Sequence, residues 1–158
     1  MVVTQINIQG MKKIIFSIAL VLIACGFSYA QDLRGIDIGT VLNYEQVISI
    51  FGEPSRYQES DSGDLGIDKY YHYGENYLHF NDDVFIGFHL RDSGFLALTT
   101  DIEGGLKVGD NLSRLDNFKY GKPKRYQNKY ILYWHCDCPV YLKVEDGIII
   151  GIDYHDPM

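Results

Sequence analysis

The residues best suited to chemistry lie in one short segment, His135-Cys136-Asp137-Cys138. Thiolates and an imidazole are good ligands for soft metal ions. Adjacent residues of a strand point to opposite faces, however, so these four side chains cannot all converge on one ion. A disulfide between Cys136 and Cys138 is the second interpretation, because an exported protein meets an oxidising compartment, and two free thiols are the third.

A disulfide that closes so small a ring would be strained and therefore comparatively reducible. Cys136 and Cys138 are thus candidates for disulfide formation or redox chemistry, and neither a resident metal nor a cofactor is expected. No catalytic residue is predicted, because no serine or cysteine lies in an elbow-type motif and the sequence contains no H-E-x-x-H.

Alternation along the strand-like segments predicts a sheet with one apolar face and one aromatic face. The apolar face is expected to take the helices and to contain Leu78, Phe80, Val84, Ile86, Phe88, Leu142, Val144, Ile148, Ile150 and Ile152. The aromatic face is expected to contain Tyr71, Tyr73, Tyr77, His79, Phe85, His89, Tyr133, His135, Tyr141, Lys143 and Ile149. Because aromatic residues are enriched at protein interfaces, this face is predicted to bind a partner. The alternative is that its rings stack across strands or are covered by a terminus.

The segments that position these residues occur twice. Residues 52–57 read GEPSRY and residues 121–126 read GKPKRY. A shared pattern of glycines and apolar residues precedes each copy, and residues 77–88 match residues 141–152 without a gap. Three blocks in the same order indicate a duplicated unit.

Each unit is predicted to be a short helix followed by strands. The strands expected in the first unit are residues 70–73, 77–80, 84–89 and 95–100, separated by turns at 74–76, 81–83 and 92–94, and those in the second unit are residues 130–135, 140–144 and 148–154. Residues 43–51 place apolar side chains on one helical face, with Asn43 as the cap and Gly52 and Pro54 as the stop. In the second unit Ser113 is expected to cap a shorter helix. The expected fold is therefore α+β, with two tandem repeats (35–100 and 105–156), each a short helix followed by a three- to four-stranded antiparallel meander, and with the helices on one face of the sheet.

The segment 39–54, GTVLNYEQVISIFGEP, and the aromatic strand after it resemble the repeat of the β-lactamase-inhibitor-protein-like fold. They are also similar to the small outer-membrane-assembly lipoproteins of the SmpA/OmlA (BamE) type. The resemblance covers residues 35–156 and implies a non-enzymatic protein that presents a broad sheet face to another protein. The chain departs from the family pattern, because two extra residues separate Gly39 from Gln46-Val47 and the second copy lacks the Gln-Val pair.

Residues 1–30 have the features of a secretory signal peptide: two lysines, an apolar run too short to span a bilayer, and small residues before a cleavage point after Ala30. The residues before Cys25 also resemble a bacterial lipobox, which would make Cys25 a lipidation site. Either interpretation places the protein in the periplasm or cell envelope, in the second case as an outer-membrane lipoprotein attached to the membrane only through Cys25.

The net charge of −7 disfavours nucleic acids and anionic membrane surfaces as partners. The sequence thus predicts an exported, non-enzymatic binding protein for a protein or envelope component. The alternatives are a thiol-redox or metal-handling protein centred on Cys136 and Cys138, and a structural envelope lipoprotein anchored at Cys25.

Overall fold

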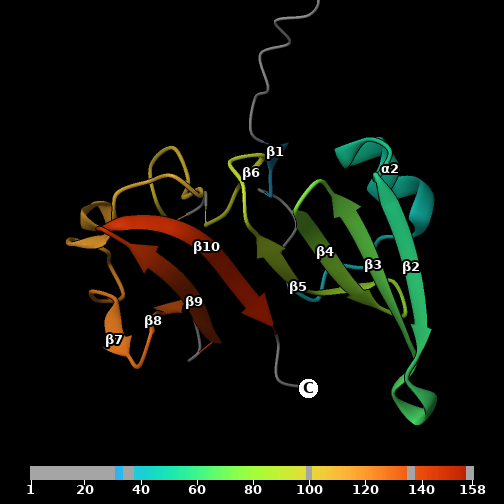
Figure 1. Ribbon diagram of the computed structural model, residues 1–158. Helices are drawn as coiled ribbons and strands as arrows, with labels where there is room; N and C mark the ends of the chain where they lie inside the picture. The colour runs from blue at the N-terminus through green and yellow to red at the C-terminus, as the bar shows by residue number, and fades with distance from the viewer. Residues whose placement is uncertain (1–30, 34–37, 99–100, 135–137, 156–158) are drawn as a thin grey trace, which may run out of the picture.

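A computed structural model describes residues 31–33, 38–98, 101–134 and 138–155, without the side chains of Trp134 and Cys138. The described part is dominated by one eight-stranded antiparallel sheet with the strand order β2-β3-β4-β5-β10-β9-β8-β7 (Figure 1). Its strands are β2 (Arg56–Asp61), β3 (Ile67–Tyr73), β4 (Asn76–Asn81), β5 (Val84–Leu90), β7 (Lys124–Tyr126), β8 (Lys129–Trp134), β9 (Cys138–Glu145) and β10 (Ile148–His155). Two runs of four strands therefore meet where β5 pairs with β10.

Tight turns explain why successive strands are antiparallel neighbours. Asp82 and Asp83 connect β4 to β5 with φ values of 44° and 69°, and Asp146 and Gly147 connect β9 to β10 with φ values of 48° and 79°. Two consecutive positive φ angles match the twist of a two-residue hairpin, and Asp and Gly tolerate them best.

The predicted first helix is confirmed as α2 (Tyr44–Phe51). The Asn43 side chain accepts a hydrogen bond from the backbone N–H of Gln46 (3.0 Å), and the Gln46 side chain accepts one from the backbone N–H of Asn43 (3.0 Å). This reciprocal capping begins the helix. Gly52, with a φ of 77°, ends it. Val47 and Phe51 are the buried residues of α2, and they hold it against the sheet.

The expected α+β fold of two helix-plus-meander repeats is wrong. The described residues contain one α-helix, and the place of the second helix is taken by the 3₁₀ turn η2 (Leu112–Leu115), capped by Asn111 rather than Ser113. The two apolar side chains of this stretch, Leu115 and Phe118, are three residues apart, a spacing that a 3₁₀ turn aligns on one side. The expected second helix on the sheet face is therefore absent from the described residues, and all eight main strands belong to a single sheet.

The sequence-based strand assignments also missed three features. The edge strands β2 and β7 are exposed and mostly polar, so they carry no apolar alternation to reveal them. The segment expected to be the fourth strand of the first meander leaves the sheet. Its residues Phe95–Leu96 form β6, which pairs in parallel with β1 (Gln31–Asp32). A second short 3₁₀ turn, η1 (Gly63–Leu65), lies between β2 and β3.

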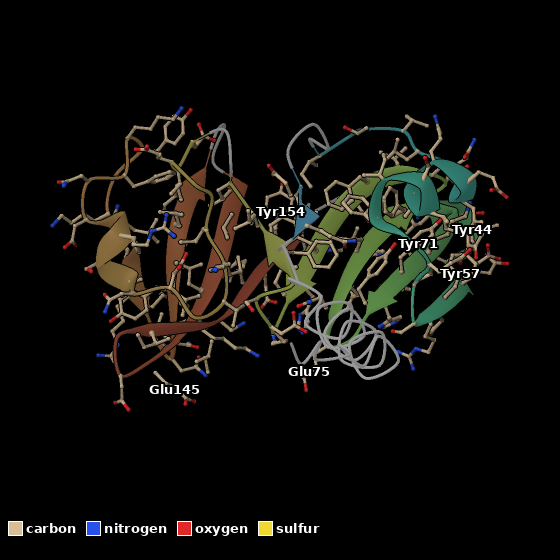
Figure 2. The ribbon with its side chains drawn as sticks, turned by 90° about the horizontal axis from the view of Figure 1, so that it is seen from above. Tyr44, Tyr57, Tyr71, Glu75, Glu145 and Tyr154 are labelled. Carbon is tan, nitrogen blue, oxygen red and sulfur yellow. The ribbon has the colours of Figure 1, made fainter. Side chains whose placement is uncertain are left out.

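The core lies on the sheet face that α2 covers, and it is continuous across both halves of the sheet. Figure 2 shows Tyr44 of α2 close to Tyr57 and Tyr71 of the sheet, with ring centroids 5.0 Å and 5.9 Å from that of Tyr44. The fully buried side chains of the sheet include Tyr71, Leu78, Phe80, Phe85, Leu90, Leu132, Leu142, Ile149 and Ile152. No helix of the described residues has both the length and the apolar character needed to cross a membrane.

Two β-bulges change which residues face the core. The register shifts between His79 and Phe80 in the β4–β5 pair and between Ile149 and Gly151 in the β9–β10 pair. An extra residue reverses the alternation beyond it. Ile149 is consequently buried at 0% exposure, whereas Ile148 and Ile150, both assigned to the core from the sequence, are 37% and 36% exposed.

Candidate interaction surface

The sheet face opposite α2, named here the open face, carries one uninterrupted row of side chains. Each strand contributes one residue to this row, and each residue is the direct cross-strand partner of the next. In strand order the row is Arg56, His72, Tyr77, His89, Asp153, Tyr141, Ile131 and Lys124. Direct cross-strand neighbours are about 5 Å apart, close enough to form one continuous surface.

Stacked rings connect strands β3, β4, β5 and β10 on the open face. Tyr77 and His89 stack with ring centroids 4.7 Å apart and planes 8° from parallel. In the next row Tyr70 stacks on His79 at 4.3 Å, and His79 stacks on His155 at 5.4 Å. These contacts hold the imidazoles in defined orientations and make the surface rigid.

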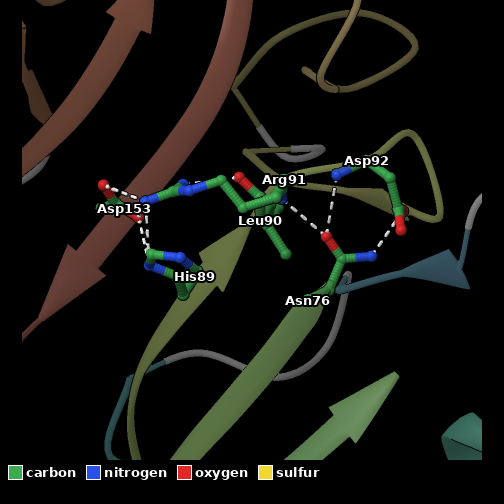
Figure 3. A network of polar contacts seen from close by, with 6 residues as sticks. All are labelled: Asn76, His89, Leu90, Arg91, Asp92 and Asp153. Atoms are coloured by element: carbon green, nitrogen blue, oxygen red, sulfur yellow. Dashed lines mark hydrogen bonds and ion pairs between the residues drawn. The ribbon is translucent and has the colours of Figure 1, made fainter. Parts of the chain in front are cut away.

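The end of β5 carries a polar network (Figure 3). Asp153 Oδ1 lies 2.7 Å from His89 Nδ1 and 2.7 Å from Arg91 Nη2, and Arg91 Nη2 donates to Asp153 Oδ2 at 2.9 Å. Arg91 Nη2 also lies within hydrogen-bond distance of His89 Nδ1, at 3.0 Å, so the guanidinium holds both side chains. The Asp153 carboxylate is thereby neutralised within the surface.

Asn76 fixes the position of the Arg91 backbone through hydrogen bonds. Its buried side chain accepts hydrogen bonds from the backbone N–H groups of Arg91 (2.7 Å) and Asp92 (3.1 Å), and its Nδ2 donates to Asp92 Oδ1 (2.5 Å). The network therefore connects a buried amide to the exposed row through the backbone.

A second acid, Asp68, is held at the edge of the open face. Its Oδ1 lies 2.9 Å from Nε2 of the buried His79 and accepts a hydrogen bond from Asn81 Nδ2 (3.2 Å). The hydrogen bond from the Ser62 hydroxyl is the main reason that the pKa of Asp68 lies below its usual value, and burial opposes it.

Three imidazoles on the open face are held toward their neutral form. Burial lowers the pKa of His79 in spite of its contact with Asp68. Burial also lowers the pKa of His89, where Asp153 opposes the shift and the charges of Arg91 and Lys143 add to it. The pKa of His72 is lowered by burial and by the Arg56 charge. At neutral pH these three imidazoles therefore act mainly as uncharged aromatic rings.

On strands β7, β8 and β9 the open face carries lysines beside tyrosine rings in place of stacked imidazoles. Lys124 Nζ lies 5.8 Å from the centroid of the Tyr133 ring, and Lys129 Nζ lies 5.4 Å from that of Tyr141. Lys143 lies on the same face, opposite Gly151 of β10. We name these five residues the lysine–tyrosine patch. It is a cationic surface on a chain whose net charge is −7.

Of the eleven residues assigned to the aromatic face from the sequence, six lie on the open face, four do not, and His135 lies outside the described residues. Those that do are Tyr77, His79, His89, Tyr133, Tyr141 and Lys143. Ile149 lies on the helix face because of the bulge in β10. Tyr71, Tyr73 and Phe85 also lie on the helix face, where Tyr71 and Phe85 are fully buried, so their expected exposure is wrong.

The physical reasons are one turn and one bulge. The β3–β4 turn was expected to contain residues 74–76, but Tyr73 pairs with Asn76 and the turn contains only Gly74 and Glu75. A turn shorter by one residue moves Tyr71 and Tyr73 to the other face. The bulge in β5 moves Phe85 in the same way.

The open face also contains residues that the sequence analysis did not assign to it. Tyr70 and His72 take the places expected for Tyr71 and Tyr73, while Arg91 and Asp153 lie at the centre of the sheet. Alternation would have found Tyr70 and His72 if a two-residue turn had been assumed. Only the β5–β10 pairing brings Arg91 and Asp153 together.

The cysteine predictions are not tested by the described residues. Cys25 and Cys136 lie outside them, and Cys138 begins β9 without a described side chain. Within the described ranges, no group of three or more His, Cys, Asp or Glu side chains is arranged to hold a metal ion.

Comparison with known proteins gives little. No family model matches the chain, and no curated protein matches it significantly in sequence. Among solved structures, a Streptococcus mutans protein provisionally described as a β-lactamase inhibitor protein is similar, with 14% identity, 89% of this chain and 98% of that chain covered, and a TM-score of 0.30. This likeness is too weak to carry an argument, and none of these comparisons supports the SmpA/OmlA relation. No function is transferred from it.

Proposed function

We propose that this chain is a non-enzymatic binding protein that uses the open face to bind another protein. The observation that carries the proposal is the row from Arg56 to Lys124, which places one side chain from each of eight strands on a single surface. Aromatic rings, imidazoles and cations dominate this row, whereas a purely solvated sheet face is ordinarily covered by short polar and charged residues.

The dimensions of the face suit a protein partner. Neighbouring strands are about 4.8 Å apart, so eight strands span roughly 34 Å. A standard protein interface covers about 800 Å² on each partner, which is a patch of roughly that width. Rigid tyrosines and histidines also lose little conformational entropy when a partner docks, which favours binding through them.

The proposal includes export, with the partner in the periplasm or cell envelope. Gln31, the first residue after the cleavage point expected from the sequence, already takes part in the fold. Its backbone N–H donates to Gly94 O (2.6 Å) and its Nε2 donates to Phe51 O (2.6 Å). A mature chain that begins at Gln31 would therefore keep the β1–β6 pair.

Site-specific photo-crosslinking tests the proposed surface. A photoreactive amino acid is placed at Tyr133 on the open face or, as the control, at Tyr120, which lies outside the sheet. The two side chains are 43% and 42% exposed, so their access to a partner differs only in location. We expect a discrete crosslinked partner from cell-envelope material at Tyr133 and not at Tyr120. Equal crosslinking at both sites would contradict the proposal.

A further inference from the structure

We propose that the partner docks an acidic segment of polypeptide on the lysine–tyrosine patch. This inference rests on the proposed function and specifies the chemistry of the partner. The patch occupies the β7–β9 end of the open face, where Lys124, Lys129 and Lys143 come from three neighbouring strands. The cross-strand register places all three on one side of the sheet.

No carboxylate of the described structure neutralises these lysines. Elsewhere in the described chain, Lys69, Lys119 and Lys122 each pair with an aspartate, namely Asp83, Asp101 and Asp116. Among the described residues, no carboxylate forms an ion pair with Lys124, Lys129 or Lys143. Two of these ammonium groups lie over tyrosine rings instead. Cation–π contacts hold a charge in place without neutralising it, so the cations stay available to an incoming carboxylate.

Asp153, the acid of the row nearest to these lysines, does not neutralise their charge. Asp153 is held by Arg91 and His89, and the cationic charge of Lys143 acts on His89 from the other side. Glu145 lies on the same face of β9, two residues from Lys143. Three lysines against this one carboxylate leave the local surface with a net positive charge, on a chain with a net charge of −7. A long polyanion would be repelled by the rest of the molecule. A short acidic segment would respond mainly to charges within the Debye length of about 8 Å.

The apolar side chains beside the lysines favour an acidic polypeptide over other polyanions as the partner. Tyr133 and Tyr126 are exposed, and Ile131 is half-buried between the strands that carry Lys124 and Lys143. An occupant that uses this surface fully must bring apolar side chains between its negative charges. Acidic peptide segments do so, whereas sulfated sugars and polyphosphates do not. Truncation of such central aromatic anchors commonly weakens binding more than removal of rim contacts.

The experiment measures the binding of a fluorescent peptide to the full folded domain. The probe is a blocked peptide of about ten residues, long enough to cross the patch when extended, that combines glutamates with leucines and serines. The charge-removed variant is Lys129→Gln/Lys143→Gln. The control, Lys122→Gln/Arg125→Gln, removes the same total charge: Lys122 pairs with Asp116 in a loop, and Arg125 points to the opposite face of β7.

We expect the charge-removed variant to bind the peptide about tenfold more weakly, and the control within about twofold of the unaltered protein, because only the first change acts locally. Lys129→Arg/Lys143→Arg should retain binding, which separates loss of charge from loss of fold. Equal binding by the charge-removed variant and the control would overturn the inference. So would equal binding of a glutamine version of the peptide, or tighter binding of a heparin oligosaccharide.

The two proposals can fail separately. If the peptide does not bind but Tyr133 still crosslinks a discrete partner, the acidic-segment inference is wrong and the proposed function stands. If neither result is obtained, both are wrong.

Discussion

His79 on β4 and His155 on β10 stack across Gly87 of β5, with ring centroids 5.4 Å apart and planes 6° from parallel. The two strands are not neighbours, so their side chains can meet only over a residue that has none. A β-carbon at Gly87 would lie 2.5 Å from the backbone oxygen of Tyr154 and 3.2 Å from Cα of His155. Gly87 is thus required both by the stack and by the backbone of β10.

The first prediction concerns this close approach. Gly87→Ala should lower the free energy of unfolding by about 2–3 kcal/mol, because the clash is with backbone that cannot rotate away. Gly151→Ala is the matched control, since its added carbon would meet only the end of the Arg91 side chain, at 2.7 Å. Urea denaturation measures both changes. A loss at Gly87 no larger than that at Gly151 would contradict this account of the β5–β10 pairing.

The second prediction uses the hydroxyl of Tyr71, which is buried without a hydrogen-bond partner among the described residues. Burial raises the pKa of Tyr71 to about 12, and the neighbouring Tyr57 hydroxyl opposes the shift. Tyr71→Phe should leave stability unchanged or raise it by about 1 kcal/mol, because it removes an unsatisfied polar group. Tyr71→Ala should cost about 3–5 kcal/mol, as expected for a large core residue. If the phenylalanine variant is clearly less stable by thermal or chemical denaturation, the hydroxyl has a partner after all.

The third prediction concerns the side-chain amide of Asn76, which accepts hydrogen bonds from the backbone next to the open face. Asn76→Ala would leave the backbone N–H groups of Arg91 and Asp92 without their acceptor. We expect a loss of about 2–3 kcal/mol in the free energy of unfolding. Ser93→Ala, an exposed change in the same turn, is the control and should be nearly neutral. Hydrogen exchange should show faster exchange at Arg91 and Asp92 in the Asn76 variant, and unchanged protection there would argue against this role.

The fourth prediction is the pH dependence of stability. The folded pKa values of His72, His79 and His89 lie below the usual value of 6.5, so the unfolded chain binds more protons just below that pH. Stability should therefore fall as the pH drops from 6.5 through the lowered folded values. The lowered pKa of Asp68 adds a further loss of stability as the pH falls below the usual aspartate value of 3.8.

Unfolding measured between pH 7.5 and pH 5 tests the histidine contribution, in the window set by the usual histidine value near 6.5. His79→Gln should make the dependence on pH less steep, because it removes one group whose folded form resists protonation. A pH dependence as steep in that variant as in the unaltered protein would show that His79 does not contribute.

The sequence by itself determined the local elements of this protein. The capping residues Asn43 and Gly52 predicted α2 within a residue, because these contacts are made inside the helix. The alternating segments of β4, β5, β9 and β10 and the turn between β4 and β5 were also evident, since strand period and turn chemistry are local properties. The edge strands β2 and β7 were not, because half-exposed polar strands carry no such pattern.

Only the tertiary structure decided which face each residue occupies and how the halves join. Strand alternation has a period of two, so the two-residue turn at Gly74-Glu75 and the bulge in β5 each reversed an assignment, which moved Tyr71 and Phe85 into the core. The pairing of β5 with β10 joins residues such as His89 and Asp153, far apart in the chain. Such pairing depends on the packing of the whole core, which no local pattern in the sequence contains.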